Sequence, residues 1–205
     1  MEIELKYAVT NMEVSQNILD DKYLKTIKDK DSDEVINMKA IYYDTEDRDL
    51  FSSKIAFRVR QEGSKIVATV KWNGTSTDGL HEREEINVPV EDETFFEAPT
   101  LSIFKESPIE DKLLNISEGK KIIPIMEMVF TRKQMRIDTG KSISEISVDT
   151  GEIITKNGNA PICEVEIELY SGDKEDMEKL GNDLADRYNL VPENTSKYKR
   201  GLDLL

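Results

Sequence analysis

The sequence predicts a mainly β (α+β) fold, a closed antiparallel β-barrel with a charged interior and with helices packed on its outside. Three observations support this prediction. Runs of alternating apolar and polar residues dominate the chain, short turns separate many of them, and the charges on their polar faces are sorted by sign. Alternation with period two is typical of strands, and short connections favour antiparallel pairing.

The alternating runs predict strands at about residues 2–9, 35–44, 54–62, 65–72, 81–90, 124–138, 142–149 and 161–170. Gly63 and Gly140 lie in short hairpin turns between consecutive runs. A longer loop is expected to start at Asn73-Gly74 and to end near Gly79.

Four helices are expected between and after these strands, at about residues 15–29, 93–105, 108–117 and 173–189. The third begins with Ser107 as a candidate cap, and Glu110 completes a capping box. The fourth, with Asp173 as a candidate cap, carries an apolar stripe at helical spacing, which predicts packing against the core.

Composition limits the partners and the compartment. The 205 residues carry a formal net charge of −14, which argues against a general nucleic-acid-binding protein, because such proteins usually show a basic patch. Cys163 is the one cysteine, so no disulfide framework can form. No secretory signal and no apolar run of roughly 20 residues is present. We therefore expect a cytoplasmic, single-domain protein (residues 1–205), monomeric or homodimeric, without a membrane or nucleic-acid partner.

Residues i and i+2 of a strand share one face, and this rule assigns the polar faces. They hold Glu2, Glu4 and Lys6; Arg58, Arg60 and Glu62; Val67, Thr69 and Lys71; Arg83, Glu85 and Asn87; Phe130, Arg132, Gln134 and Arg136; Glu145, Ser147 and Asp149; and Glu164, Glu166 and Glu168.

For any single strand, the ordinary interpretation of such a face is contact with water. Across the set, however, some faces are almost purely acidic and others almost purely basic, and like charges on one face repel unless an opposite charge lies between them. Barrel closure would bring the two kinds of face around one lumen. Because arginines at alternate positions suit phosphate oxygens, the pattern indicates an interior that holds a metal ion and polyphosphate, with the apolar faces directed outward.

Ordered motifs along nearly the whole chain resemble those of a known family. The opening Glu2-x-Glu4-x-Lys6 resembles its ExExK signature. Further blocks follow in the expected order: Tyr43-Asp44-Thr45 with Leu50, Ala56-Phe57-Arg58-Val59-Arg60, Thr69-Val70-Lys71, Arg83-x-Glu85, Val148–Ile153, Pro161–Leu169 with Ser171-Gly172-Asp173, and Ser196-Lys197 with Arg200-Gly201. The chain is thereby similar to the CYTH superfamily, or triphosphate tunnel metalloenzymes, and most similar to their inorganic triphosphatase branch. The resemblance implies an eight-stranded antiparallel tunnel, and we expect no accessory helical domain after Leu205.

The resemblance also implies roles for individual residues. Mg²⁺ or Mn²⁺ would be held by Glu2, Glu4 and a carboxylate of the late strand, since both ions prefer carboxylate and water ligands. The candidate metal ligands are Glu2, Glu4, Asp149, Glu164, Glu166 and Glu168, with Glu145 in reserve. The candidate phosphate-binding residues are Lys6, Arg58, Arg60, Lys71, Arg83 and Arg132, with Lys197 and Arg200 near one end. The expected catalytic set is Glu2, Glu4, Lys6, Arg58, Arg60, Glu166 and Glu168.

Three functions stay open on the sequence. The first is hydrolysis of inorganic tripolyphosphate to pyrophosphate and phosphate. The second is a class IV-type adenylate cyclase or a nucleoside or thiamine triphosphatase on the same barrel, and the third is a non-catalytic polyphosphate-binding module. Two residues are expected outside the chemistry: Cys163 as a small buried hydrophobe, and His81 at the surface or at the tunnel mouth.

Overall fold

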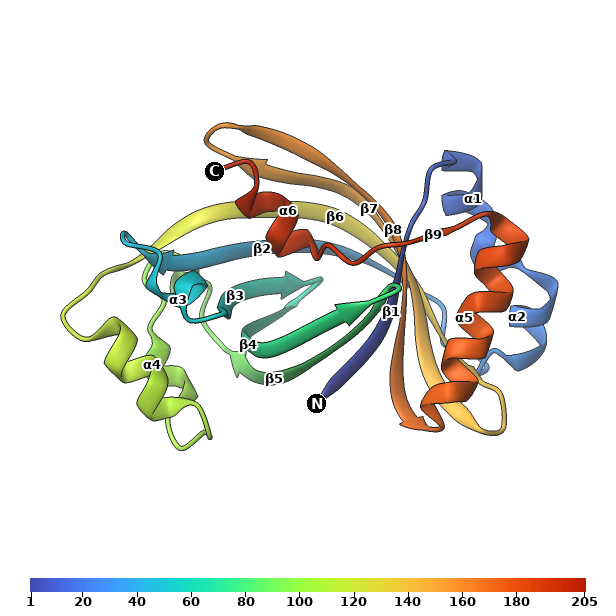
Figure 1. Ribbon diagram of the computed structural model, residues 1–205, viewed down its shortest axis with the longest axis horizontal. Helices are drawn as coiled ribbons and strands as arrows, with labels where there is room; N and C mark the ends of the chain where they lie inside the picture. Colours follow the sequence, from blue (N-terminus) through green and yellow to red (C-terminus); the bar gives the residue numbers. More distant parts are fainter.

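A computed structural model shows a closed antiparallel barrel and describes residues 1–205, apart from the side chain of Met12 (Figure 1). The barrel strands are β1 (Glu2–Ala8), β2 (Glu34–Thr45), β3 (Ile55–Glu62), β4 (Lys65–Thr77), β5 (Leu80–Val90), β6 (Ile122–Asp138), β7 (Ser142–Thr155) and β8 (Gly158–Gly172). They are hydrogen-bonded in the order β5-β4-β3-β2-β6-β7-β8-β1, and a β1–β5 pairing closes the ring. The short strand β9 (Val191–Pro192) is added to β1. The predicted fold class is confirmed.

One predicted loop is a strand. We expected a loop from Asn73-Gly74 onward, but β4 continues to Thr77, and its register with β5 shifts between Trp72 and Thr75. Asn73 takes a positive φ of 52° at this irregularity. Asn73 and Gly74 therefore form a bulge within β4 and not the start of a loop. The true turn between β4 and β5 lies at Asp78-Gly79.

The helices differ more from the prediction. The expected helix 15–29 is divided into α1 (Met12–Asn17), the 3₁₀ turn η1 (Ile18–Asp20) and α2 (Lys22–Ile27). It divides because the Asp21 carboxylate accepts hydrogen bonds from the Tyr23 and Leu24 backbone N–H groups and thereby starts a new helix.

The expected helix 93–105 is wrong. The segment forms two 3₁₀ turns, η2 (Glu93–Phe96) and η3 (Leu101–Phe104), on either side of Pro99. A proline disfavours helical backbone at the residue before it, and this separates the two turns.

The helix expected at 108–117 is present as α4 (Glu110–Ser117), but Ile109 takes the cap position, and the Ser107 hydroxyl has no hydrogen-bond partner among the described residues. The last long helix is confirmed as α5 (Lys174–Tyr188), although the Asp173 side chain makes no capping bond. Two short helices were not predicted, α3 (Asp49–Ser52) and α6 (Lys197–Leu202). None of the described helices has the length and apolar character needed to span a membrane.

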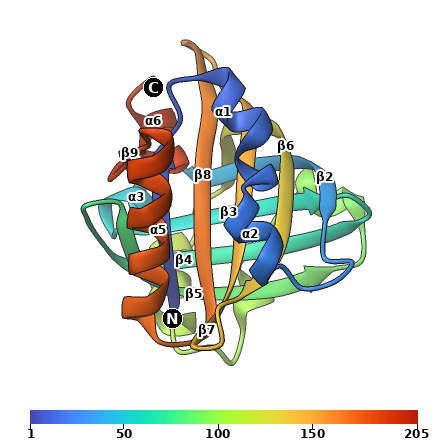
Figure 2. The same cartoon turned by 90° about the vertical axis from the view of Figure 1, so that its right-hand side faces the viewer.

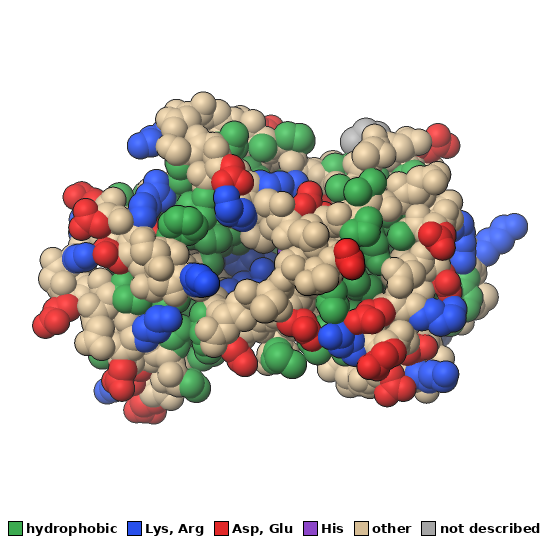
Figure 3. Space-filling model, viewed as in Figure 1, with side chains coloured by type: hydrophobic (Ala, Val, Ile, Leu, Met, Phe, Trp, Pro, Cys, Tyr) green, Lys and Arg blue, Asp and Glu red, His purple; other side chains and the backbone are tan. Residues whose placement is uncertain are grey.

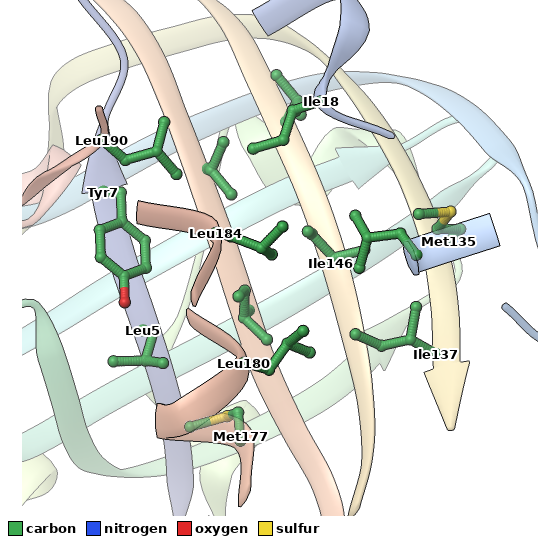
Figure 4. Close-up of a cluster of buried hydrophobic side chains, with 14 of the residues drawn as sticks. Leu5, Tyr7, Ile18, Met135, Ile137, Ile146, Met177, Leu180, Leu184 and Leu190 are labelled. Atoms are coloured by element: carbon green, nitrogen blue, oxygen red, sulfur yellow. The ribbon is translucent and has the colours of Figure 1, made fainter. Parts of the chain in front are cut away.

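Two apolar clusters cover the outside of the barrel. Helices α1, α2 and α5 lie over β1, β8, β7 and β6 (Figure 2). Leu184 of α5 points toward Ile146 of β7, and Leu180, Leu5 and Tyr7 belong to the same cluster (Figure 4). The second cluster joins β3 and β4 to η3 and α4, and Trp72 packs against it.

The third apolar cluster corrects the prediction that all apolar faces point outward. Met38, Ala40 and Tyr42 of β2, with Met128 and Phe130 of β6, line the interior. They contact α6, whose Tyr198 ring stacks on Tyr42 with the centroids 5.0 Å apart. The lumen is therefore charged along one part of its wall and apolar where α6 packs.

Candidate functional site

A cavity of about 290 Å³ lies inside the barrel. In the space-filling view it opens as a hollow with basic side chains at its bottom (Figure 3). The basic residues that line it are Lys6, Arg58, Arg60, Lys71, Arg83, Arg132 and Lys197. The acidic ones are Glu2, Glu4, Glu62, Glu85, Glu145, Glu166 and Glu168. Seven positive and seven negative groups balance, so the interior does not share the net charge of −14 that the whole chain carries.

Strand β1 places the first two glutamates. Its alternation directs Glu2 and Glu4 inward, where Arg83 of β5 binds both carboxylates, with its Nη2 atom 2.7 Å from Glu4 Oε1. The Lys71 ammonium donates to Glu2 Oε1 at 2.9 Å. Burial opposes ionisation of Glu2, but the charges of Lys71 and Arg83 outweigh it and lower its pKa.

Glu168 of β8 completes this carboxylate group. It pairs in register with Glu4 of β1 and with Glu145 of β7. Burial, followed by the charges of Glu2 and Glu4, raises the pKa of Glu168 to about 7. Within the described part of the chain it has no ion pair with a lysine or arginine. Glu2 is paired with Lys71 and Arg83, and Glu4 with Lys6 and Arg83, so Glu168 alone of the three lacks a cation partner among the described residues. Carboxylate oxygens are the donors that Mg²⁺ or Mn²⁺ prefers, so this group could hold a divalent cation.

A second acidic cluster lies deeper, where Asp149, Glu164 and Glu166 bring carboxylate oxygens within 4.8 Å of one another. Lys197 Nζ lies 2.7 Å from Asp149 Oδ2 and 2.9 Å from Glu166 Oε1, and it also binds Glu164. Arg132 binds Asp149 through two bonds of 2.7 Å.

Further cations complete this second cluster. Lys6 Nζ lies 2.9 Å from Glu166 Oε1, and Arg200 binds Glu164. Burial opposes ionisation of Glu166, but Lys197, Lys6 and Arg132 lower its pKa well below the usual value. Because four cations already satisfy these oxygens, the cluster fits a divalent metal less well than Glu2, Glu4 and Glu168 do.

Two arginines of β3 differ in their surroundings. Arg60 Nε donates to Glu62 at 2.6 Å. Arg58 is buried and makes no ion pair with a carboxylate among the described residues. Its Nη2 lies 3.4 Å from Thr69 Oγ1, and the guanidinium also interacts with the Tyr42 hydroxyl, whereas its Nε has no hydrogen-bond partner among the described residues. A buried guanidinium with unused donors is a binding group for an anion.

Most of the residues proposed from the sequence line this cavity, but three do not. Asp149 and Glu164 are fully buried behind its wall, and Arg200 pairs with Glu164 outside it. The structure also places there Glu62, Glu85, Asn87, Gln134 and Tyr170, whose facing followed from alternation, Ser196, which the closing motif included, and Tyr42 and Tyr198, which had no such signal.

The expectation for His81 is wrong. It is 5% exposed, and its Nε2 lies 2.8 Å from the Glu193 carbonyl oxygen. The residue is enclosed because the tip of the β4–β5 hairpin packs against residues 193–194. Cys163 is half-buried and packs against the outer apolar cluster, close to the expected role.

Comparisons with known proteins agree with this architecture. HpAC1 from Hippeastrum, described as an adenylyl cyclase with a dominant triphosphatase activity, covers 99% of this chain and 96% of its own, with a TM-score of 0.75 and 18% identity. The PH1819 protein of Pyrococcus horikoshii covers 99% of each chain, with a TM-score of 0.61 and 19% identity. At these identities the likeness shows the fold.

Comparison at the level of sequence shows the family to which the chain belongs. The inorganic triphosphatase of Haemophilus influenzae is 32% identical over 161 residues, which are 78% of this chain and 44% of that protein. The chain thus spans less than half the length of this curated relative. The family model described as the CYTH domain matches residues 1–202. The chain with this charged tunnel belongs to the CYTH domain family.

Proposed function

We propose that this protein is a metal-dependent triphosphatase that hydrolyses inorganic tripolyphosphate to pyrophosphate and phosphate inside the tunnel. The observation that carries the proposal is the cavity, in which basic side chains gather opposite Glu2, Glu4 and Glu168. The relative in Haemophilus influenzae that is named an inorganic triphosphatase supports it.

The cavity selects for a compact anion. Its volume of about 290 Å³ is at the lower limit of ligand pockets, which span roughly 300–1,000 Å³. Arg58 offers the unpaired donor at its Nε to phosphate oxygens. Lys6, Lys71 and Arg83 already hold carboxylates, and they can share these contacts with a substrate once a cation binds the same carboxylates.

The reaction needs no nucleophilic side chain. The oxygen of a water molecule forms a bond to the terminal phosphorus, and the bond from that phosphorus to the bridging oxygen breaks. The electron pair stays on the bridging oxygen, pyrophosphate leaves, and the two protons of the water are carried away by the phosphate and pyrophosphate products. Fixed positive groups that neutralise this developing charge lower the barrier. Arg58, Arg60 and Lys71 are proposed for this role.

Glu2, Glu4 and Glu168 are proposed to hold Mg²⁺ or Mn²⁺. When bound, such an ion supplies Lewis-acid polarisation of phosphoryl oxygens and orientation of water. Glu166, which the sequence suggested as a ligand, is proposed instead to anchor Lys6 and Lys197, because both lysines lie 2.9 Å from its Oε1 atom.

The test is phosphate release from tripolyphosphate and from ATP, with Mg²⁺ and with Mn²⁺, for the wild type and for Glu4→Gln. We expect rapid release from tripolyphosphate, slower release from ATP and loss in the variant. Glu84→Gln is the matched control, because Glu84 is on the same barrel but lies half-exposed on the outer face of β5. Turnover by Glu4→Gln equal to that of Glu84→Gln would remove Glu4 from the metal site.

A nucleoside triphosphate is the second candidate substrate. A shallow groove lined by Val35, Asn37, Lys39 and Gln61 continues the cavity at Ile36, Met38, Glu62 and Gln134, and it could receive an organic group. Preferred turnover of ATP, or formation of cyclic AMP, would favour this candidate. Tight binding of tripolyphosphate without turnover at any metal would indicate a binding module.

Other expectations stay predictions. We propose that residues 1–205 form one tunnel domain, which the family match over residues 1–202 supports. The cytoplasmic location, the monomeric or homodimeric state and the lack of a nucleic-acid or membrane partner stay as the sequence predicted them. Gel filtration and cell fractionation would test them.

A further inference from the structure

The tip of the β4–β5 hairpin contacts the segment that leads into α6. Asn194 Oδ1 accepts hydrogen bonds from the Gly79 backbone N–H at 2.8 Å and from the Ser76 hydroxyl at 3.1 Å. The His81 Nε2 atom donates to the Glu193 carbonyl oxygen at 2.8 Å. We call these bonds between Ser76, Gly79, His81, Glu193 and Asn194 the hairpin contact.

The hairpin contact holds the backbone of Lys6 from both sides. The Lys6 N–H donates to the Gly79 carbonyl at 2.8 Å, and the Lys6 carbonyl accepts from the Glu193 N–H at 2.9 Å. Gly79 has a φ of +80°, and a Cβ atom there would lie 2.6 Å from the Lys6 carbonyl oxygen. The hairpin tip is therefore built for close approach to Lys6.

The same contact leads directly to Lys197. The Glu193 carboxylate accepts from the Thr195 N–H at 2.7 Å, and Ser196 caps α6 by accepting from the Lys199 N–H at 3.2 Å. Lys197, the first residue of α6, then reaches Glu164 and Glu166. Lys6 and Lys197 converge on the same two carboxylates from opposite ends of the chain.

We propose that Asn194 and His81 are positioning residues, which fix Lys6 and Lys197 relative to each other so that both cations face the triphosphate. Neither residue lines the cavity, so each acts through the two lysines. The expected loss of turnover rests on the proposed function, whereas the expected effect on the position of α6 rests on the structure alone.

The first test compares Asn194→Ala with Asn159→Ala. Both asparagines are exposed, and both make side-chain hydrogen bonds, but Asn159 binds Glu152 on the β7–β8 hairpin, away from the cavity. We expect Asn194→Ala to lose about tenfold in kcat/KM for tripolyphosphate, which corresponds to about 1.4 kcal/mol of lost orientation of the two lysines. Asn159→Ala should match the wild type.

Combination with Lys197→Ala separates positioning from general destabilisation. If Asn194 acts through Lys197, Asn194→Ala should cause little further loss in the Lys197→Ala background, because coupled residues are not additive. At His81, Gln retains an N–H donor and should keep most of the activity, whereas Leu should lose as much as Asn194→Ala. Additive losses, or equal activity of the Gln and Leu variants, would overturn the proposal.

A measurement without substrate keeps this inference separate from the proposed function. Amide hydrogen exchange should speed up in residues 197–202 of Asn194→Ala, and it should stay unchanged in Asn159→Ala. If the wild type neither binds nor cleaves tripolyphosphate, the proposed function fails, while this exchange result still decides whether the hairpin contact fixes α6. Unchanged exchange in both variants would refute the contact's role.

Discussion

Arg58 and Arg132 carry the same guanidinium inside the same barrel, but their partners differ. Arg132 donates hydrogen bonds to Asp149 and Glu166. Arg58 faces the cavity without a carboxylate partner among the described residues, and its Nε donor is unpaired. A cation without a carboxylate partner is available to bind a substrate. A fully paired cation chiefly compensates the charge of buried carboxylates and so stabilises the fold. Substitution of Arg58 should therefore reduce activity, and substitution of Arg132 should reduce stability.

For Arg58→Ala we expect kcat/KM for tripolyphosphate to fall about 10²–10³-fold, the loss typical of one electrostatic donor. Stability should change little, since no buried carboxylate loses its partner. Steady-state phosphate release and urea denaturation measure the two effects. The control is Arg136→Ala, an exposed arginine that contacts the Tyr170 ring but does not itself line the cavity, and equal activity of the two variants would contradict the prediction.

For Arg132→Ala we expect a loss of about 3 kcal/mol in the free energy of unfolding, because removing one partner leaves buried charge uncompensated. Asp149 is fully buried and Glu166 nearly so. Without Arg132, Lys197 would be the remaining cation at Asp149, and Lys197 and Lys6 would remain at Glu166. Urea denaturation at pH 7 measures this loss. A change below about 1 kcal/mol, the range of exposed ion pairs, would show that the network tolerates the missing cation.

At the scale of elements, α5 packs so closely on β1 that its glycine is required. A Cβ atom at Gly181 would lie 2.5 Å from Leu5 Cδ1 and 2.6 Å from the Tyr7 hydroxyl. Both neighbours are almost fully buried and have little room to move. The stability of α5 therefore depends more on this packing against β1 than on the helix propensity of its residues.

Gly181→Ala tests which effect is larger. Helix propensity alone would favour alanine by about 1 kcal/mol, whereas overpacking a core costs about 1–3 kcal/mol. We expect the clash to dominate and the variant to unfold at lower urea concentration. Asn182→Ala, at the next and exposed position of α5, should be neutral or stabilising. A more stable Gly181→Ala would show that α5 can move away from β1.

Asp21 joins two elements and makes their contact dependent on pH. Its carboxylate caps α2 and accepts hydrogen bonds from Arg187 and from the Tyr188 hydroxyl of α5. Burial opposes ionisation, but these bonds lower the pKa of Asp21 below its ordinary value of 3.8. The charged form therefore stabilises the fold above that value, and this contribution is lost as the pH falls through the folded-state pKa.

Asp21→Asn should lower the free energy of unfolding at pH 7 by about 1–2 kcal/mol, the usual value of a cap with a charged hydrogen bond. The difference from the wild type should shrink below about pH 4, where the unfolded carboxyl takes up a proton. Denaturation curves at pH 7 and at pH 3 measure it. Asp20→Asn, at the exposed neighbour, is the control, and a difference that persists at pH 3 would contradict the assignment.

At the scale of the whole molecule, backbone hydrogen bonds between strands close the barrel. Backbone pairing runs through all eight strands and returns from β5 to β1, and cations of the chain already compensate the deep acidic cluster. A catalytic ion should therefore affect activity and ligand-linked stability, while the fold persists without it.

Chelation with EDTA should abolish phosphate release and leave the far-ultraviolet circular dichroism spectrum unchanged. Added Mg²⁺ should restore release. Tripolyphosphate with Mg²⁺ at a hundredfold excess over its dissociation constant should stabilise the fold by about 2.7 kcal/mol. Unfolding on chelation would instead indicate a structural metal, as in domains that fold only with their ion.

The sequence by itself determined the strands and the direction of most of their side chains, because alternation is a local property of the chain. Glu2, Glu4, Arg58, Lys71, Arg83 and Glu168 are found in the cavity for this reason. The same rule covers Glu62, Asn87 and Gln134, whose facing was correct although no role was assigned to them.

The tertiary structure alone decided which charges are free. Asp149 and Glu164 do not line the cavity, because α6 brings Lys197 and Arg200 against them from a position more than 30 residues later in the chain. The division of helix 15–29, the burial of His81 and the apolar wall beside Tyr198 have the same origin. Each depends on contacts between segments that are distant in sequence, and no local pattern of residues encodes which segments will meet.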